Sequence, residues 1–189
     1  SILLTGNSST GNSIQMDSAT LNAKEGTITI SSATVITDSA SFDTTGGTVV
    51  GDVTFASTVD AGSSGTGTIT VNAGTGNFIA SDNIGATTAP ASISATGANI
   101  SLQNVTTTGA QSYTGTSMTN GSYTTEGGAI SFTGDVIADA DLTVDTTAGT
   151  NPAGADINIT GALSSAFGEG NNISLNGGTV GNVTLSGDA

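Results

Sequence analysis

The sequence has no cysteine, histidine, arginine or tryptophan, and Lys24 is its only basic residue. Without cysteine, no disulfide can stabilise the fold. Fifteen acidic residues give the 189-residue chain a net charge of −14. This charge argues against nucleic acid and anionic membranes as partners, because both are bound through basic side chains. No run of apolar residues is long enough to span a bilayer.

Large rings and charged groups are also scarce. Aromatic residues make up 4% of the chain and charged residues 8%, where a typical globular domain has about 25% charged residues. We therefore do not expect a compact core built on large rings or a Tyr anchor. The chain instead has 28 glycines, many Ser and Thr, and β-branched residues along its whole length. This composition favours an ordered β protein over a disordered chain.

A short motif of apolar, polar and apolar residues recurs along the chain. It is found at Ile28-Thr29-Ile30, Val53-Thr54-Phe55, Ile69-Thr70-Val71, Ile100-Ser101-Leu102, Ile130-Ser131-Phe132, Leu142-Thr143-Val144, Ile157-Asn158-Ile159, Ile173-Ser174-Leu175 and Val183-Thr184-Leu185. Alternation with a period of two predicts strands with one buried face, and no segment has the period of a helix. Strands this short favour a parallel β-helix, or β-solenoid, of about nine coils with little or no α-helix. An irregular β-sandwich is the alternative.

Comparison of the chain with itself shows an internal repeat of about 102 residues. Matched segments include Met16 and Met118, Ile28 and Ile130, Ile30 and Phe132, and Asp43-Thr44-Thr45 and Asp145-Thr146-Thr147. No linker interrupts the seam, so we predict one continuous β-solenoid over 1–189, with repeats 1–102 and 103–189, the second truncated. Because Ile2-Leu3-Leu4 and Val183-Thr184-Leu185 are apolar and lie close to the two ends, we expect the rod to continue on both sides.

Three segments of the chain combine Thr-rich stretches, Gly boundaries and alternating apolar positions. They are Val105-Thr106-Thr107-Thr108-Gly109-Ala110-Gln111-Ser112-Tyr113-Thr114-Gly115, Gly127-Gly128-Ala129-Ile130-Ser131-Phe132-Thr133-Gly134 and Leu142-Thr143-Val144-Asp145-Thr146-Thr147. They resemble the repeats of filamentous-haemagglutinin-like bacterial exoproteins and adhesins. The resemblance implies a right-handed parallel β-helix, secretion to the bacterial cell surface, and an adhesive or structural role in an extracellular filament. The partners expected are neighbouring repeats or copies of the chain stacked end to end, with glycans or cell surfaces as further candidates.

Catalysis is the weaker interpretation of the acidic residues. Polysaccharide lyases with β-helices commonly use Arg or Lys as the base, and the chain has only Lys24. A glycosidase needs two carboxylates that flank one bond, and Asp139 and Asp141, with Asp135 nearby, are the candidates. We interpret them as turn and surface acids, and the Asp145-Thr146-Thr147 corner as an Asx turn. We therefore assign no catalytic, cofactor-binding or metal-binding residue and expect no enzyme; a polysaccharide-binding or polysaccharide-cleaving β-helix is the alternative.

Other ligands have partial support in the sequence. Acids and carbonyls leave weak calcium binding open, but no calcium-binding motif occurs, so no cofactor is expected. Thr27-Ile28-Thr29 and Thr66-Gly67-Thr68-Ile69-Thr70 match the hydroxyl ranks of ice-binding solenoids, but Ser, Asn or Ala in other motifs break the rank. Triplets that fit the glycosylation pattern Asn-x-Ser/Thr occur often, among them those at Asn99, Asn104, Asn158, Asn172 and Asn182. So Ser- and Thr-rich a chain gives them by chance.

Overall fold

The computed structural model describes residues 1–5, 13–148 and 151–187. This part of the chain consists of strands β1 to β21 joined by turns and contains no helix. Every strand pairing within it is parallel. An antiparallel sandwich does not fit this pairing. A β-helix-like fold does, because parallel neighbours are joined by crossovers and not by hairpins.

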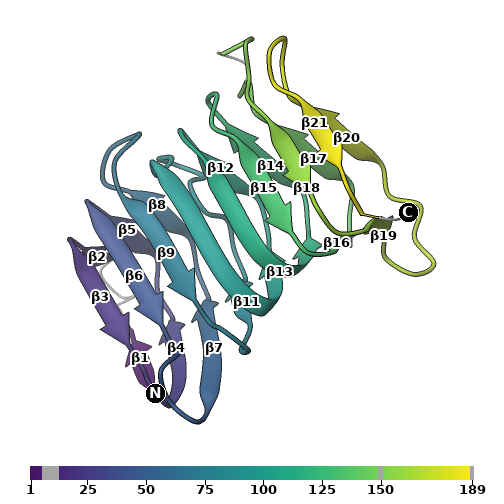
Figure 1. The fold of residues 1–189 in the computed structure, drawn as a ribbon. Helices are drawn as coiled ribbons and strands as arrows, with labels where there is room; N and C mark the ends of the chain where they lie inside the picture. The colour runs from purple at the N-terminus through teal and green to yellow at the C-terminus, as the bar shows by residue number, and fades with distance from the viewer. Residues whose placement is uncertain (6–12, 149–150, 188–189) are drawn as a thin grey trace.

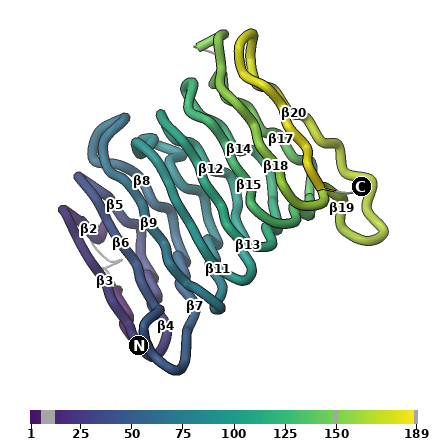
Figure 2. The backbone as a smooth tube through the Cα atoms, in the orientation of Figure 1, coloured from purple at the N-terminus to yellow at the C-terminus, as the bar shows by residue number. Residues whose placement is uncertain are grey.

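The register of the strands places them in three rows, which the chain visits in a fixed order (Figures 1 and 2). The first row contains β1 (Ile2–Leu4), β4 (Gly26–Ile30), β7 (Val50–Phe55), β10 (Phe78–Ala80), the C-terminal parts of β11 (Ser92–Leu102) and β13 (Gln111–Thr119), β16 (Val136–Ala138) and β19 (Leu163–Ser165). The two long strands, β11 and β13, continue from the third row into the first.

The second and third rows are built in the same way. The second row contains β2 (Ile14–Met16), β5 (Thr34–Ile36), β8 (Val59–Ala61), the bridge residue Ile84, β12 (Val105–Thr107), β14 (Ser122–Thr125), β17 (Leu142–Asp145) and β20 (Ile173–Asn176). The third row contains β3 (Ala19–Asn22), β6 (Ser39–Asp43), β9 (Thr68–Asn72), the N-terminal parts of β11 and β13, β15 (Ile130–Thr133), β18 (Ile157–Ile159) and β21 (Val183–Leu185).

Alternating side chains of each strand point inward and form one core. Ile28 and Ile30 of β4 are buried, for example, while Thr29 between them is partly exposed. All nine apolar-polar-apolar motifs lie in strands, as the sequence predicts. The buried side chains of successive strands join into a single cluster that extends from Met16 to Ile159. Burial of each Ile or Val contributes about 1.5–3 kcal/mol relative to exposure, so stacking replaces the missing disulfides.

The expectation that large rings do not build the core is wrong. The few aromatic residues are gathered in two clusters, and only Phe167 is exposed. In the first cluster the rings of Phe42, Phe55 and Phe78 meet edge to face, with centroids 4.9 and 5.2 Å apart. Edge-to-face pairs contribute about 0.5–1.5 kcal/mol beyond their buried area, so a low aromatic content still supplies large anchors.

The second aromatic cluster surrounds a buried amide. Tyr113 stacks on Phe132 with centroids 5.0 Å apart, and Tyr123 meets both rings edge to face. The Tyr113 hydroxyl donates to Oε1 of Gln111 (3.0 Å), and Nε2 of Gln111 donates to the carbonyl oxygen of Thr124 (2.9 Å). Burial raises the pKa of both tyrosines above the ordinary value of 10.0. The two tyrosines are therefore core anchors, which the sequence had not indicated.

Stacked glycines form the corner between the third and first rows. Gly97, Gly115, Gly134 and Gly161 lie in successive passages of the chain, each against the backbone of the previous one. A Cβ on Gly134 would lie 2.6 Å from the carbonyl oxygen of Gly115. Gly115 and Gly134 also have φ values of +138° and +124°, which L side chains rarely adopt. No side chain fits at this corner, so successive strands stack closely there.

The sequence repeat and the rows follow different periods. Ile28 lies in the first row, in β4, whereas its repeat partner Ile130 lies in the third row, in β15. Val53 and Ile157 are related in the same way. A shift by one repeat therefore moves a residue to another row of the structure.

Candidate functional surface

The acids singled out from the sequence lie at corners and not in a shared cleft. Asp139 follows β16 and Asp141 precedes β17, and both are exposed. The Asp141 carboxylate accepts hydrogen bonds from the backbone N–H (2.8 Å) and the side-chain Nδ2 (3.3 Å) of Asn172. These bonds hold the pKa of Asp141 below its usual range, so it is ionised at neutral pH and unsuited to donate a proton as a general acid. Asp135 accepts a hydrogen bond from the backbone N–H of Ala162 (2.9 Å).

The predicted Asx turns are confirmed. One carboxylate oxygen of Asp145 accepts from both the backbone N–H and the hydroxyl of Thr147, at 2.7 Å each. Asp43 binds Thr45 with the same two bonds and the same distances. Nδ2 of Asn176, from the next strand of the second row, also donates to Asp145 (3.2 Å). The acids shared by both repeats therefore close turns, and Oδ1 of each accepts hydrogen bonds within the chain.

Asp and Asn side chains also join successive strands at the row edges. Asp52 accepts from the backbone N–H (2.7 Å) and Nδ2 (3.0 Å) of Asn77, which in turn accepts from Nδ2 of Asn99 (2.8 Å). Each of these residues directly precedes the first inward-pointing residue of a strand segment in its row. The same position is held by Asn83, Asn104, Asp135, Asp141, Asp156, Asn172 and Asn182. We call this set the Asx edge; sequence reasoning missed it, although an Asp or Asn before an apolar-polar-apolar motif is visible in the sequence.

The placement of the Asx edge bears on metal binding and glycosylation. Within the described ranges, no three acidic side chains come together in a group able to hold a metal ion. Of the five Asn-x-Ser/Thr asparagines named from the sequence, four belong to the Asx edge, where Nδ2 donates a hydrogen bond: Asn99, Asn104, Asn172 and Asn182. The fifth, Asn158, lies in the middle of β18. The polar side chains of this edge stabilise the stack of strands.

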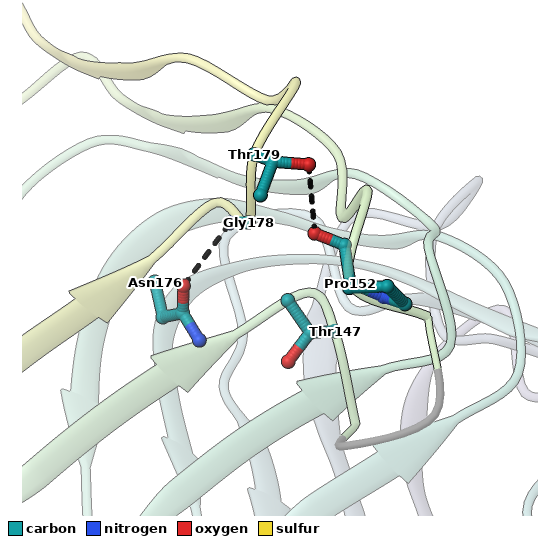
Figure 3. Close-up of a pocket in the computed structure, with 5 residues that line it drawn as sticks. All are labelled: Thr147, Pro152, Asn176, Gly178 and Thr179. Carbon is teal, nitrogen blue, oxygen red and sulfur yellow. Dashed lines mark hydrogen bonds between the residues drawn. The ribbon is translucent and has the colours of Figure 1, made fainter.

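A shallow hollow lies beside the C-terminal strands of the second row (Figure 3). Its lining is Thr147, Pro152, Asn176, Gly178 and Thr179. The Thr179 hydroxyl donates to the carbonyl oxygen of Pro152 (3.1 Å), and the Gly178 N–H donates to Oδ1 of Asn176 (3.1 Å). No lining side chain is ionisable, so none of them can act as a general acid or base near neutral pH.

The C-terminal end of the three rows exposes apolar side chains. In the third row, Ile157 and Ile159 of β18 are fully buried, whereas their register partners Val183 and Leu185 of β21 are 44% and 53% exposed. In the second row, Ile173 of β20 is likewise exposed. These side chains continue the core but no further strand of the described chain covers them.

The search for membrane-spanning helices in the described chain and the comparisons with known proteins both found nothing. The part that the structure describes has no helix long and apolar enough to cross a membrane. Comparison with known proteins found no matching family model, no similar curated protein and no similar solved structure.

Proposed function

We propose that the chain is a section of a right-handed parallel β-solenoid that acts as a non-enzymatic structural and adhesive rod. The proposal is supported by the order of the rows, since the described chain passes through all three of them eight times. About nine coils were expected. At about 4.8 Å for each stacked strand, eight coils give a rod about 40 Å long.

The exposed apolar layer at the C-terminal end is the observation that carries the proposal. Its side chains, including Val183 and Leu185, point along the line of the core but are only half covered. The last strand of each row (β19, β20 and β21) has one unpaired edge within the described chain, and β20 and β21 bear the exposed side chains. A parallel strand from a neighbouring repeat or another copy would bury this layer and pair with these edges. We therefore propose end-to-end stacking into a longer filament.

Sedimentation velocity over a range of concentrations tests this stacking. We expect the chain to associate as its concentration rises, and Val183→Lys to prevent association by placing a charge in the apolar layer. Val49→Lys is the matched control, because Val49 is 63% exposed in a turn away from that end and its substitution leaves association unchanged. A wild-type chain that stays monomeric at every concentration would contradict end-to-end stacking.

The cellular role we propose is that of a filamentous-haemagglutinin-like module of a secreted bacterial surface protein. Its support is the sequence resemblance and an acidic surface that favours solubility. Glycans or cell surfaces are its proposed adhesive partners. A glycan array combined with a reducing-sugar assay tests this role. Binding without turnover is expected, and turnover that Asp141→Asn abolishes would replace the adhesive role with a polysaccharide-cleaving one.

A further inference from the structure

The outward face of the third row carries two columns of small polar side chains from β9 to β21. The hydroxyl column is Thr70, Ser94, Ser112, Ser131, Asn158 and Thr184, paired in that order by the strand register. The threonine column is Asn72, Thr96, Thr114, Thr133, Thr160 and Ser186. None of these side chains is buried. We call the two columns the hydroxyl array.

Along the sequence the rank of hydroxyls is interrupted, because turns of different length separate the residues that match in the structure. The register shows that the alanines lie elsewhere: Ala110 and Ala129 directly precede β13 and β15 and are not in either column. Four successive strands have threonine in the second column, from Thr96 to Thr160. The register therefore removes the alanines from the rank, while Ser and Asn remain beside threonine in both columns.

The array is neutral and free to bind outside the chain. It contains no charged or aromatic side chain, although the whole chain has a net charge of −14. Within the described residues, the hydroxyls of Thr96, Thr114 and Thr133 make no hydrogen bond. The outward Thr124 of the second row, in contrast, donates to the hydroxyl of Thr106 (3.1 Å). Nδ2 of Asn72, at the N-terminal end of the array, donates to the hydroxyl of Thr45 (3.3 Å). The three threonine hydroxyls are therefore available to solvent or to a partner.

The geometry of the array selects the partner. Stacked strands lie about 4.8 Å apart and alternate residues about 6.6–6.8 Å apart along a strand, so the hydroxyls form a two-dimensional lattice. A single hydrogen bond gains only about 0.5–1.5 kcal/mol over its exchange with water, so binding needs many bonds at once and a partner with its own planar repeat. The two columns offer no aromatic platform for a soluble sugar and no charged side chain for an ion, although Asp43 of β6 lies in register with Asn72 at their N-terminal end.

We infer that the hydroxyl array binds the ordered water lattice of an ice surface. An ice surface is planar, periodic and neutral. Water molecules ordered on the threonine hydroxyls can become part of the ice lattice and need not be displaced, because bridging water preserves the hydrogen bonds. The threonine methyl groups fill the spaces between the hydroxyls and limit the positions that this water can take. This activity is independent of end-to-end stacking, because it uses the side of the rod and not its ends.

Partition of the protein into slowly growing pure ice tests the inference. The array variant is Thr114→Lys with Thr133→Lys, and the control is Thr29→Lys with Thr54→Lys, which are also register partners but lie in the first row. We expect the wild type and the control to enter the ice and the array variant to be depleted about tenfold. Circular dichroism confirms that each variant is folded.

A second variant separates loss of the hydroxyl from loss of the fold. Thr114→Val with Thr133→Val keeps the shape and the β preference of threonine, and should also enter ice less than the wild type. Exclusion of the wild type from ice overturns the inference, as does equal partition of the wild type and both array variants. Retention of the wild type on crystalline cellulose, together with exclusion from ice, would assign the face to a polysaccharide instead.

Discussion

Substitution of one corner glycine tests how the rows are held in register. Gly134 has a φ of +124°, and an added Cβ would lie 2.6 Å from the carbonyl oxygen of Gly115 and 2.9 Å from its carbonyl carbon. Both neighbouring atoms belong to the backbone, so neither can move without separating β13 from β15. Gly134→Ala therefore combines backbone strain with overpacking and should destabilise the fold.

The loss of stability in Gly134→Ala is the sum of two free-energy costs, backbone strain and overpacking. A residue held at an unfavourable φ costs about 1–3 kcal/mol, and overpacking costs about 1–3 kcal/mol. Replacing glycine also restricts the unfolded chain, which offsets about 0.4–1 kcal/mol. The net loss expected for Gly134→Ala is about 1–5.5 kcal/mol, a large part of the roughly 5–15 kcal/mol that stabilises a typical domain.

Urea unfolding followed by far-ultraviolet circular dichroism measures this loss as a lower midpoint. Gly170→Ala is the matched control, because Gly170 has no left-handed φ and no atom within 4 Å of an added Cβ; its midpoint should stay near that of the wild type. Equal midpoints for the two variants would refute the tight glycine corner. A change in slope as well as midpoint would indicate that the variant unfolds in more than one step.

Three further changes test the core and the Asx edge. Phe132→Ala should lower the free energy of unfolding by about 3–5 kcal/mol, whereas Phe167→Ala, at a fully exposed ring, should leave it unchanged in the same urea titration. Tyr113 and Tyr123 have a raised pKa, so the folded state keeps them neutral above pH 10 while the unfolded state ionises. Stability should therefore fall as the pH rises above about 10; tyrosinate absorbance at alkaline pH should appear together with unfolding, and ionisation before unfolding would contradict their burial. The pKa of Asp141 is lowered in the folded state, so its carboxylate stabilises the fold fully above about pH 4, and this stabilisation is lost as the pH falls through the folded-state pKa. Asp141→Asn should therefore reduce the loss of thermal stability in acid. An unchanged dependence of thermal stability on acid pH would contradict the hydrogen bonds from Asn172.

The sequence predicts the strand type well where inward residues are apolar. All nine apolar-polar-apolar motifs form strands, because period-two alternation leaves one face to bury. Strands such as β12 and β14 were missed, since their inward positions include Thr107, Tyr123 and Thr125. Threonine suits either face of a strand, so its direction depends on neighbours that the local pattern does not show.

The rows could not be predicted from the sequence repeat. Met16 and Met118 match in sequence, but Met16 is buried in the second row and Met118 is 39% exposed in the first. Turn lengths differ from one passage to the next, so the same spacing along the chain does not return to the same row. The Asx edge and the hydroxyl array depend on contacts between distant strands, and each becomes apparent only with the register.

From β13 onward, turn length varies at only two of the three corners of the described chain. Only two residues, beginning with Gly134 or Gly161, separate Thr133 from Val136 and Thr160 from Leu163 at the third-to-first corner. The longer turns, such as the one that carries Phe167, lie at the other corners. The glycine corner thus borders the threonine column directly and keeps its neighbours at the spacing of stacked strands. In β11 one extra residue at this corner, between Thr96 and Asn99, is accommodated by a register shift that leaves Thr96 paired with Thr114. The face of the third row therefore stays intact where the turns on either side of it change in length.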